Sequence, residues 1–139
     1  MPLVNPTGLV HFSLPANDVE ESLRFYTEIL GLKFRGNVGA GKCVTVGDVN
    51  IILAPRPKPR PVEEIDEMNT PFCHYAFYVS SADFDRAYDG LAESGVKVDG
   101  EPEYRRNGTF TGRSLYFWDP TGNRLELNDP NPPSWPDGV

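Results

Sequence analysis

The chain contains few histidines and cysteines and no long apolar run. Only two residues of each type occur among its 139 residues. No segment approaches the roughly 20 apolar residues that a membrane-spanning helix needs, and residues 1–6 lack the basic and apolar regions of a signal peptide. These absences argue against a membrane protein and against a disulfide-rich secreted domain. We therefore expect a cytoplasmic protein in which Cys43 and Cys73 are reduced, buried thiols.

Positive charge is also scarce. The chain has 13 Lys and Arg against 20 Asp and Glu, which gives a formal net charge of −7 at pH 7. Nucleic acids and anionic membrane surfaces are bound through basic fields, so both are excluded as expected partners. A hydrophobic fraction of 39% suffices for the core of one domain at this length. A small molecule is the expected partner.

The two histidines stand at matching points of two similar halves. Each lies near the start of a strand-like run that leads into a helix-like run. The first helix is predicted to end at Gly31 and the second at Gly95. The spacing from His11 to Gly31 differs by one residue from the spacing between His74 and Gly95. The sequence therefore contains an internal repeat.

Each half is predicted to be a βαβββ module. We expect Asn17 to cap the first helix and the run from Ser80 to cap the second. Alternating apolar residues predict short strands after each helix. These strands are expected at about 32–34, 42–46 and 49–54 in the first half, and at about 96–98, 113–118 and 124–128 in the second.

We expect one domain over residues 1–139, with the modules at 8–54 and 72–128. Between them, residues 55–71 begin with alternating prolines, which predict an extended linker. This linker is either a surface connector or a flap beside a pocket. Residues 129–139 form a proline-rich tail.

The strand phase gives each late strand one apolar face and one mixed face. The mixed faces carry His74 and Tyr78, then Ser114, Tyr116 and Trp118, then Glu126. A lone strand histidine or glutamate is more often an ordinary packing or surface residue, but the repeat favours a shared role. Two imidazoles and one carboxylate form a divalent-metal site with open positions. The predicted ligands are His11, His74 and Glu126.

The segments His74–Phe77 and Ser114–Glu126 resemble the vicinal oxygen chelate superfamily. That superfamily includes glyoxalases, bleomycin-resistance proteins, extradiol dioxygenases and fosfomycin-resistance enzymes, and the resemblance covers residues 9–128. It implies an α+β fold in which two βαβββ modules form a curved mixed sheet around a divalent metal. It also implies a homodimer with the site near the subunit interface.

The layout is most similar to that of the fosfomycin-resistance thiol transferases. This resemblance implies that Tyr116 acts on the bound oxygen as a hydrogen-bond donor or proton shuttle. Arg106 stands where that family has a lysine, whereas Phe72 replaces a family tyrosine. The family's C-terminal substrate arginine has no counterpart, so a doubly charged phosphonate would lose a bidentate partner. The expected substrate-binding residues are Ser13, Ser114, Arg106, Tyr78 and Trp118.

The resemblance implies a divalent-metal-dependent enzyme that acts on a small substrate chelating the metal through oxygen. Extradiol-type oxygenation and addition of a thiol or water both remain open. The expected metal is Fe2+ or Mn2+, with Zn2+, Ni2+ and Co2+ as alternatives. A metal-free drug-binding protein of the bleomycin-resistance type is the main alternative, and a domain with a relic site is a third.

Overall fold

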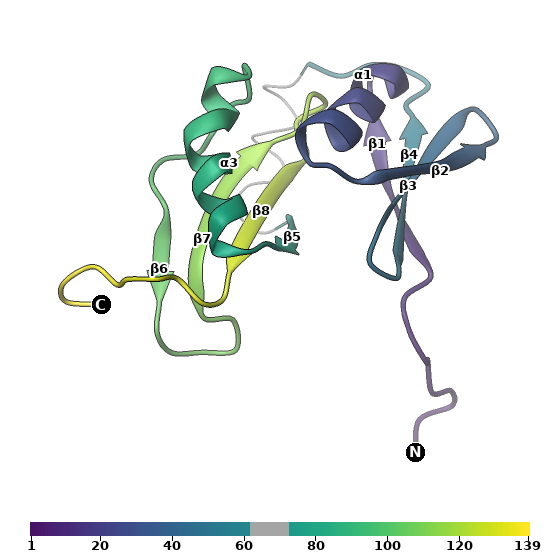
Figure 1. Ribbon diagram of the computed structural model, residues 1–139. Coiled ribbons are helices and arrows are strands. Elements are labelled where there is room, and N and C mark those ends of the chain that lie inside the picture. The colour runs from purple at the N-terminus through teal and green to yellow at the C-terminus, as the bar shows by residue number, and fades with distance from the viewer. Residues whose placement is uncertain (62–72) are drawn as a thin grey trace. The chain divides into compact units, whose positions relative to one another are not determined.

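A four-stranded mixed sheet with a helical segment recurs in both halves of the chain (Figure 1). The computed structural model describes residues 1–61 and 73–139. The chain divides into two compact units, residues 1–60 and 61–139. The observed order of elements confirms the predicted α+β class and the βαβββ pattern. The expected linker lies largely outside the described residues, as does Phe72.

Unit 1 forms a sheet with the order β1-β4-β3-β2. The first strand runs parallel to β4, and the other neighbours are antiparallel. Its elements are β1 (His11–Ala16), α1 (Val19–Arg24), the π-helical turn η1 (Phe25–Ile29), β2 (Lys33–Val38), β3 (Gly41–Val46) and β4 (Val49–Pro55).

Asp18, rather than the predicted Asn17, caps helix α1. The Asp18 carboxylate accepts a hydrogen bond from the backbone N–H of Glu21 at 3.1 Å. Asn17 is instead bound to Arg60 twice, because its amide donates to the Arg60 carbonyl at 2.7 Å and accepts from the Arg60 backbone N–H at 3.0 Å. Asn17 therefore ties the end of unit 1 to the start of its helix.

Unit 2 repeats the arrangement with the order β5-β8-β7-β6. Ser80 caps α3 as predicted, since its hydroxyl accepts a hydrogen bond from the Asp83 N–H at 3.1 Å. The strand expected at 96–98 is reduced to a single bridge between Val98 and Phe117. Its elements are β5 (Tyr75–Tyr78), α3 (Ser81–Glu93), β6 (Glu103–Arg105), β7 (Gly112–Trp118) and β8 (Arg124–Asp129).

The sheet of unit 2 has the two different faces that the alternation predicts. Leu115 lies opposite Leu127, and Phe117 lies opposite Leu125. All four side chains are buried, as is Phe84 on α3, and the helix covers this face of the sheet (Figure 1). The opposite face carries polar side chains, and it holds the candidate site.

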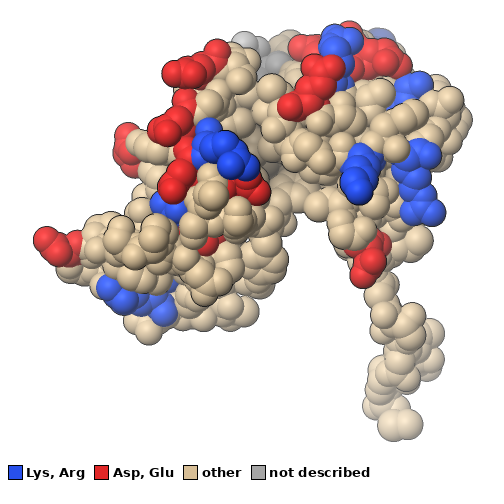
Figure 2. Space-filling model, in the orientation of Figure 1, with Lys and Arg blue, Asp and Glu red and all other residues tan. Residues whose placement is uncertain are grey.

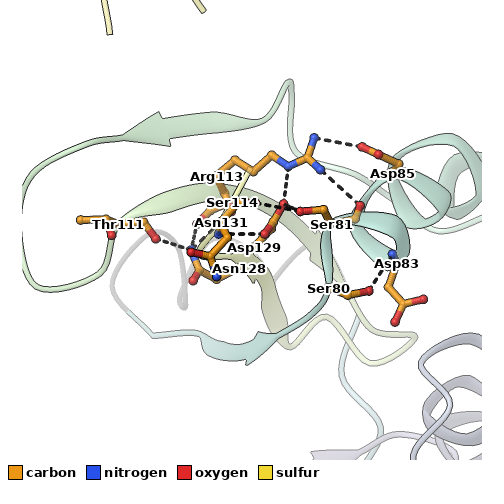
Figure 3. A network of polar contacts seen from close by, with 10 residues as sticks. All are labelled: Ser80, Ser81, Asp83, Asp85, Thr111, Arg113, Ser114, Asn128, Asp129 and Asn131. Atoms are coloured by element: carbon orange, nitrogen blue, oxygen red, sulfur yellow. Dashed lines mark hydrogen bonds and ion pairs between the residues drawn. The ribbon is translucent and has the colours of Figure 1, made fainter. Parts of the chain in front are cut away.

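A polar network fastens α3 to the ends of β7 and β8 (Figure 3). Arg113 Nε donates to the buried Asp129 carboxylate at 2.9 Å, and Arg113 Nη1 lies 2.9 Å from Asp85 on the helix. The Ser81 hydroxyl also donates to Asp129, at 2.8 Å. Burial alone would raise the pKa of Asp129, but the hydrogen bonds from Ser81, the Asn131 backbone and Arg113 hold it below its usual value.

Both cysteines are free thiols, but only one is buried. Cys43 lies inside β3 and is buried, as expected. Cys73 is exposed, which corrects the prediction for that residue. It lies two positions before Tyr75, the first residue of β5, and so outside the strand. Among the described residues, no helix has the length and apolar character needed to cross a membrane.

Candidate metal and ligand site

Glu126 lies at the middle of the polar face of unit 2. Its strand, β8, is central, so Glu126 has Ala76 of β5 on one side and Tyr116 of β7 on the other. The side chain is buried between these strands. His74 directly precedes β5, and its Nε2 lies 2.9 Å from Oε2 of Glu126. Two of the three predicted metal ligands therefore meet within one unit.

The second oxygen of Glu126 has its own partner. The Ser114 hydroxyl donates to Oε1 at 2.6 Å, and the Asn128 amide donates to the Ser114 oxygen at 3.2 Å. Ser114 and Asn128 are opposite each other in the register of β7 and β8. Ser114 and Asn128 are both buried, and their hydrogen bonds fix the orientation of the Glu126 carboxylate.

Tyr116 lies beside the His74–Glu126 pair. The Tyr116 ring meets the His74 ring edge-on with a centroid separation of 5.7 Å. The Arg124 guanidinium lies 4.6 Å from the same tyrosine ring. Burial and the charge of Glu126 raise the pKa of Tyr116, whereas the hydrogen bond from Arg105 works in the opposite direction. The net shift is upward, so the hydroxyl is protonated at neutral pH.

Arg105 is a site residue that the sequence analysis missed. Its Nη2 donates to the Tyr116 hydroxyl oxygen at 2.8 Å. Burial works to lower the pKa of Arg105, but the hydrogen bonds to Tyr116 and Glu103 raise it above its usual value. Strand β6 lies outside the strands that the sequence predicts in this half. Recognising the strand would have placed Glu103 and Arg105 on the face that carries Ser114.

Arg106 lies elsewhere. Its guanidinium stacks 4.4 Å from the Trp135 ring, and its Nε donates to the carbonyl of Val139. The next arginine along the chain, Arg113, belongs to the helix-covered face through its ion pair with Asp129.

The polar face opens into a pocket of about 460 Å³ within unit 2. This volume lies in the range of about 300–1,000 Å³ that is usual for small-molecule sites. Tyr78 lines the pocket. Trp118 is buried and is not part of the lining, and the Lys97 ammonium and the Arg124 guanidinium lie 4.4 and 5.3 Å from its ring centroid. The lining residues are His74, Ala76, Phe77, Tyr78, Arg105, Phe110, Tyr116, Glu126 and Asn128.

His11 and Ser13 belong to unit 1. They share the exposed face of β1, and their register partners on β4 are Asn50 and Ile52. Within unit 2, the described residues include no group of three His, Cys, Asp or Glu side chains arranged to hold a metal. Of the three predicted ligands, His74 and Glu126 are the two that lie together in unit 2.

The His74–Glu126 pair fits part of a divalent-metal site. Nε2 of His74 and Oε2 of Glu126 are 2.9 Å apart, a hydrogen-bond distance that also brings the two donor atoms within reach of one ion. Imidazole and carboxylate suit Fe, Mn, Zn and related ions. The hydrogen bond from Ser114 is the kind of outer contact that orients a ligating carboxylate.

Comparison with known proteins places this site in context. The family model described as "Glyoxalase/Bleomycin resistance protein/Dioxygenase superfamily" matches residues 8–127. The chain is 30% identical over 121 residues to the glutathione transferase FosA of Serratia marcescens, covering 87% of this chain and 79% of FosA. It is 28% identical over 119 residues to the metallothiol transferase FosB of Lysinibacillus sphaericus, covering 85% of this chain and 79% of FosB.

Solved structures show the same fold. A glyoxalase/dioxygenase from Nostoc punctiforme superposes with a TM-score of 0.76 at 24% identity, covering 94% of this chain and 98% of that chain. A variant of the fosfomycin resistance protein FosX from Listeria monocytogenes, solved with Mn(II) and 1S,2S-dihydroxypropylphosphonic acid, superposes with a TM-score of 0.71 at 21% identity. That match covers 91% of this chain and 93% of the FosX chain.

Proposed function

Because the chain belongs to the glyoxalase/bleomycin resistance protein/dioxygenase superfamily, we propose that it is a divalent-metal-dependent enzyme acting on a small oxygen-bearing substrate. The observation that carries this proposal is the 2.9 Å contact between His74 and Glu126 in the wall of a pocket. We propose His74 and Glu126 as metal ligands. His11 is proposed as the third ligand because of its matching place in the sequence repeat.

Addition of a thiol or water to the substrate is the reaction that we propose. FosA of Serratia marcescens, a glutathione transferase, and FosB, a metallothiol transferase, support this choice through their similarity over most of the chain. Mn2+ and Fe2+ are the proposed metals, since FosX was solved with Mn(II). Zn2+, Ni2+ and Co2+ suit the same donors.

The residues around the pair have separate proposed roles. A bound divalent ion supplies Lewis acidity to a substrate oxygen. Ser114 holds Glu126 in one orientation through the 2.6 Å hydrogen bond. Tyr116 donates a hydrogen bond or a proton to the bound substrate oxygen. Ser13 is proposed to contact the substrate because of its place two residues after His11.

Metal content tests the proposal directly. The chain, purified without a chelator or a His-tag, is expected to hold about one divalent ion. Elemental analysis of His74→Ala and Glu126→Gln is expected to show that the ion is lost, and His11→Ala is expected to weaken binding. Glu103→Gln is the matched control, because it removes an exposed carboxylate outside the pocket lining. Full metal occupancy in both His74→Ala and Glu126→Gln contradicts the proposal.

Two assays separate the reactions. Protein loaded with Mn(II) is incubated with glutathione and a panel of epoxides, and the adducts are identified by mass spectrometry. Protein loaded anaerobically with Fe(II) is then exposed to oxygen and a panel of catechols. Thiol adducts support addition, whereas a yellow ring-cleavage product identifies an oxygenase.

A metal-free binding protein is the second candidate function. The apolar wall of the pocket, which includes Ala76, Phe77 and Phe110, favours it. A binding protein of this kind gains thermal stability from its ligand by mass action, and a chelator leaves that gain unchanged. Loss of the gain after EDTA treatment supports the enzyme instead.

We also propose that the chain forms a homodimer in the cytoplasm, with the site near the subunit interface. Light scattering across a concentration series measures whether the chain forms a dimer. A monomer at all concentrations contradicts it.

A further inference from the structure

The Tyr116 hydroxyl has a fixed hydrogen-bond polarity. A guanidinium can only donate, so the 2.8 Å contact makes the Tyr116 oxygen an acceptor from Arg105. The hydrogen of the same hydroxyl must then point away from Arg105. Among the described residues, this hydroxyl donates no hydrogen bond to an acceptor. Tyr116 lines the pocket, where a ligand can supply the missing acceptor.

Arg105 has N–H groups that its two contacts within the protein do not use. Its contacts with Tyr116 and Glu103 both use Nη2. In the described part of the chain, its Nη1 and Nε have no partner. The Glu103 side chain is 62% exposed and lies 3.3 Å away, so this ion pair is weak. The guanidinium therefore retains most of its charge and its N–H groups for a ligand.

Apart from His74, Glu126 and Asn128, the rest of the pocket wall is apolar and aromatic. Tyr78 is 72% exposed and Phe110 is 65% exposed, yet both line the pocket. Phe77 and Ala76 complete this part of the wall. Large exposed aromatic side chains beside a pocket are typical of a surface that a ligand covers.

We propose that Arg105, acting with the Tyr116 hydroxyl that it orients, selects the ligand of this pocket. The ligand class is a small molecule with an aromatic or apolar body and an anionic oxygen group, such as a carboxylate. The oxygen accepts hydrogen bonds from Arg105 and Tyr116, and the body lies against Tyr78 and Phe110. This inference rests on the proposed function in that it concerns the same pocket, but it does not require the metal.

The test uses the full chain, freed of metal with EDTA, and three matched probes: benzoate, benzyl alcohol and benzylamine. Binding is followed by changes in the backbone amide signals of Tyr78 and Phe110 in NMR titrations. Benzoate is expected to bind more tightly than both neutral benzyl alcohol and cationic benzylamine. Arg105→Gln is expected to weaken benzoate binding about tenfold, the usual effect of losing a charge-assisted hydrogen bond, and to leave benzyl alcohol unchanged. Arg105→Lys is expected to restore most of the benzoate affinity, because it keeps the positive charge.

Arg106→Gln is the matched control, since it removes the neighbouring guanidinium, which contacts Trp135 and Val139 instead of the pocket. Equal weakening by Arg106→Gln and Arg105→Gln overturns the proposal. So does equal binding of benzoate and benzylamine to the unmodified chain, or an absence of benzoate binding. Metal content is measured on the same samples after reloading. A normal metal site without benzoate selection refutes only this inference, and benzoate selection without a metal site refutes only the proposed function.

Discussion

Nε2 of His74 lies 2.9 Å from Oε2 of Glu126, although 52 positions separate the two residues in the chain. The parallel pairing of β5 with β8 produces this contact, because it sets Ala76 beside Glu126 and leaves His74 just before the strand. Single mutations can test this contact and the hydrogen bond from Ser114 to Glu126 separately.

Removal of the Ser114 hydroxyl is expected to weaken metal binding without abolishing it. Ser114→Ala loses the 2.6 Å hydrogen bond to Glu126, so the carboxylate is less well oriented. Loss of such an outer contact typically weakens metal binding by about 10- to 100-fold. Competition with a fluorescent chelator measures the change. Ser94→Ala, which removes an exposed hydroxyl on α3's C-terminal end, is the control and should bind as the unmodified chain does. Equal metal affinity in both variants contradicts the orienting role.

Asp129 is expected to make stability depend on pH in the acidic range. Its folded-state pKa is lowered, so the stabilisation is complete above the unfolded pKa of about 3.9 and is lost as pH falls through the folded value. Asp129→Asn breaks the buried pair with Arg113 and is expected to lower the free energy of unfolding by about 3 kcal/mol at pH 7. The difference from the unmodified chain should shrink below about pH 4.

Urea unfolding between pH 7 and pH 2.5 measures this effect. Asp85→Asn is the matched control, because Asp85 also pairs with Arg113 at 2.9 Å but is 60% exposed. It is expected to change stability by less than about 1 kcal/mol. A difference for Asp129→Asn that stays constant over this pH range would show that its charge is not what stabilises the fold.

Gly112 is expected to tolerate no side chain. Its φ is +108°, and a Cβ there would lie 2.1 Å from the carbonyl oxygen of Asp129. Gly112→Ala should therefore lower the free energy of unfolding by more than about 2 kcal/mol. Gly90→Ala is the opposite case, because Gly90 lies inside α3 with open space around it. It is expected to raise stability by roughly 1 kcal/mol. Thermal unfolding measures the stability of both variants. A similar change in stability at the two glycines would contradict the close approach of Gly112 to the Asp129 carbonyl.

The cap of α1 provides a test of unit 1. Asp18→Ala removes the acceptor for the Glu21 N–H and is expected to destabilise the fold by about 1 kcal/mol. Glu20→Ala changes the same helical turn but removes only an exposed contact with Lys42 at 3.5 Å. Its effect should stay below about 0.5 kcal/mol. Chemical unfolding followed by circular dichroism compares the stability of the two variants. An equal loss of stability in both would contradict the capping role of Asp18.

Local sequence patterns predicted much of unit 2 correctly. Alternation placed Ser114, Tyr116 and Glu126 on one face of the sheet, and the observed register agrees. Figure 2 shows acidic side chains along the region of α3, consistent with an amphipathic helix that buries Phe84 and Leu91. The prediction of the α1 cap was wrong because two adjacent residues have side chains that can cap a helix. Asn17 and Asp18 are both good caps, but the Asn17 side chain is bound to Arg60 and Arg56 and Asp18 makes the cap.

The sequence by itself determined the two βαβββ modules and the face of each late strand on which the polar residues lie. These features follow from the period of the apolar residues, which is a local property of the chain. Only the tertiary structure decided that Arg105, and not Arg106, reaches the pocket, and that Ser114 holds Glu126. A shift of one residue along a strand turns a side chain to the opposite face, so such assignments depend on strand register, which is fixed by contacts between distant segments.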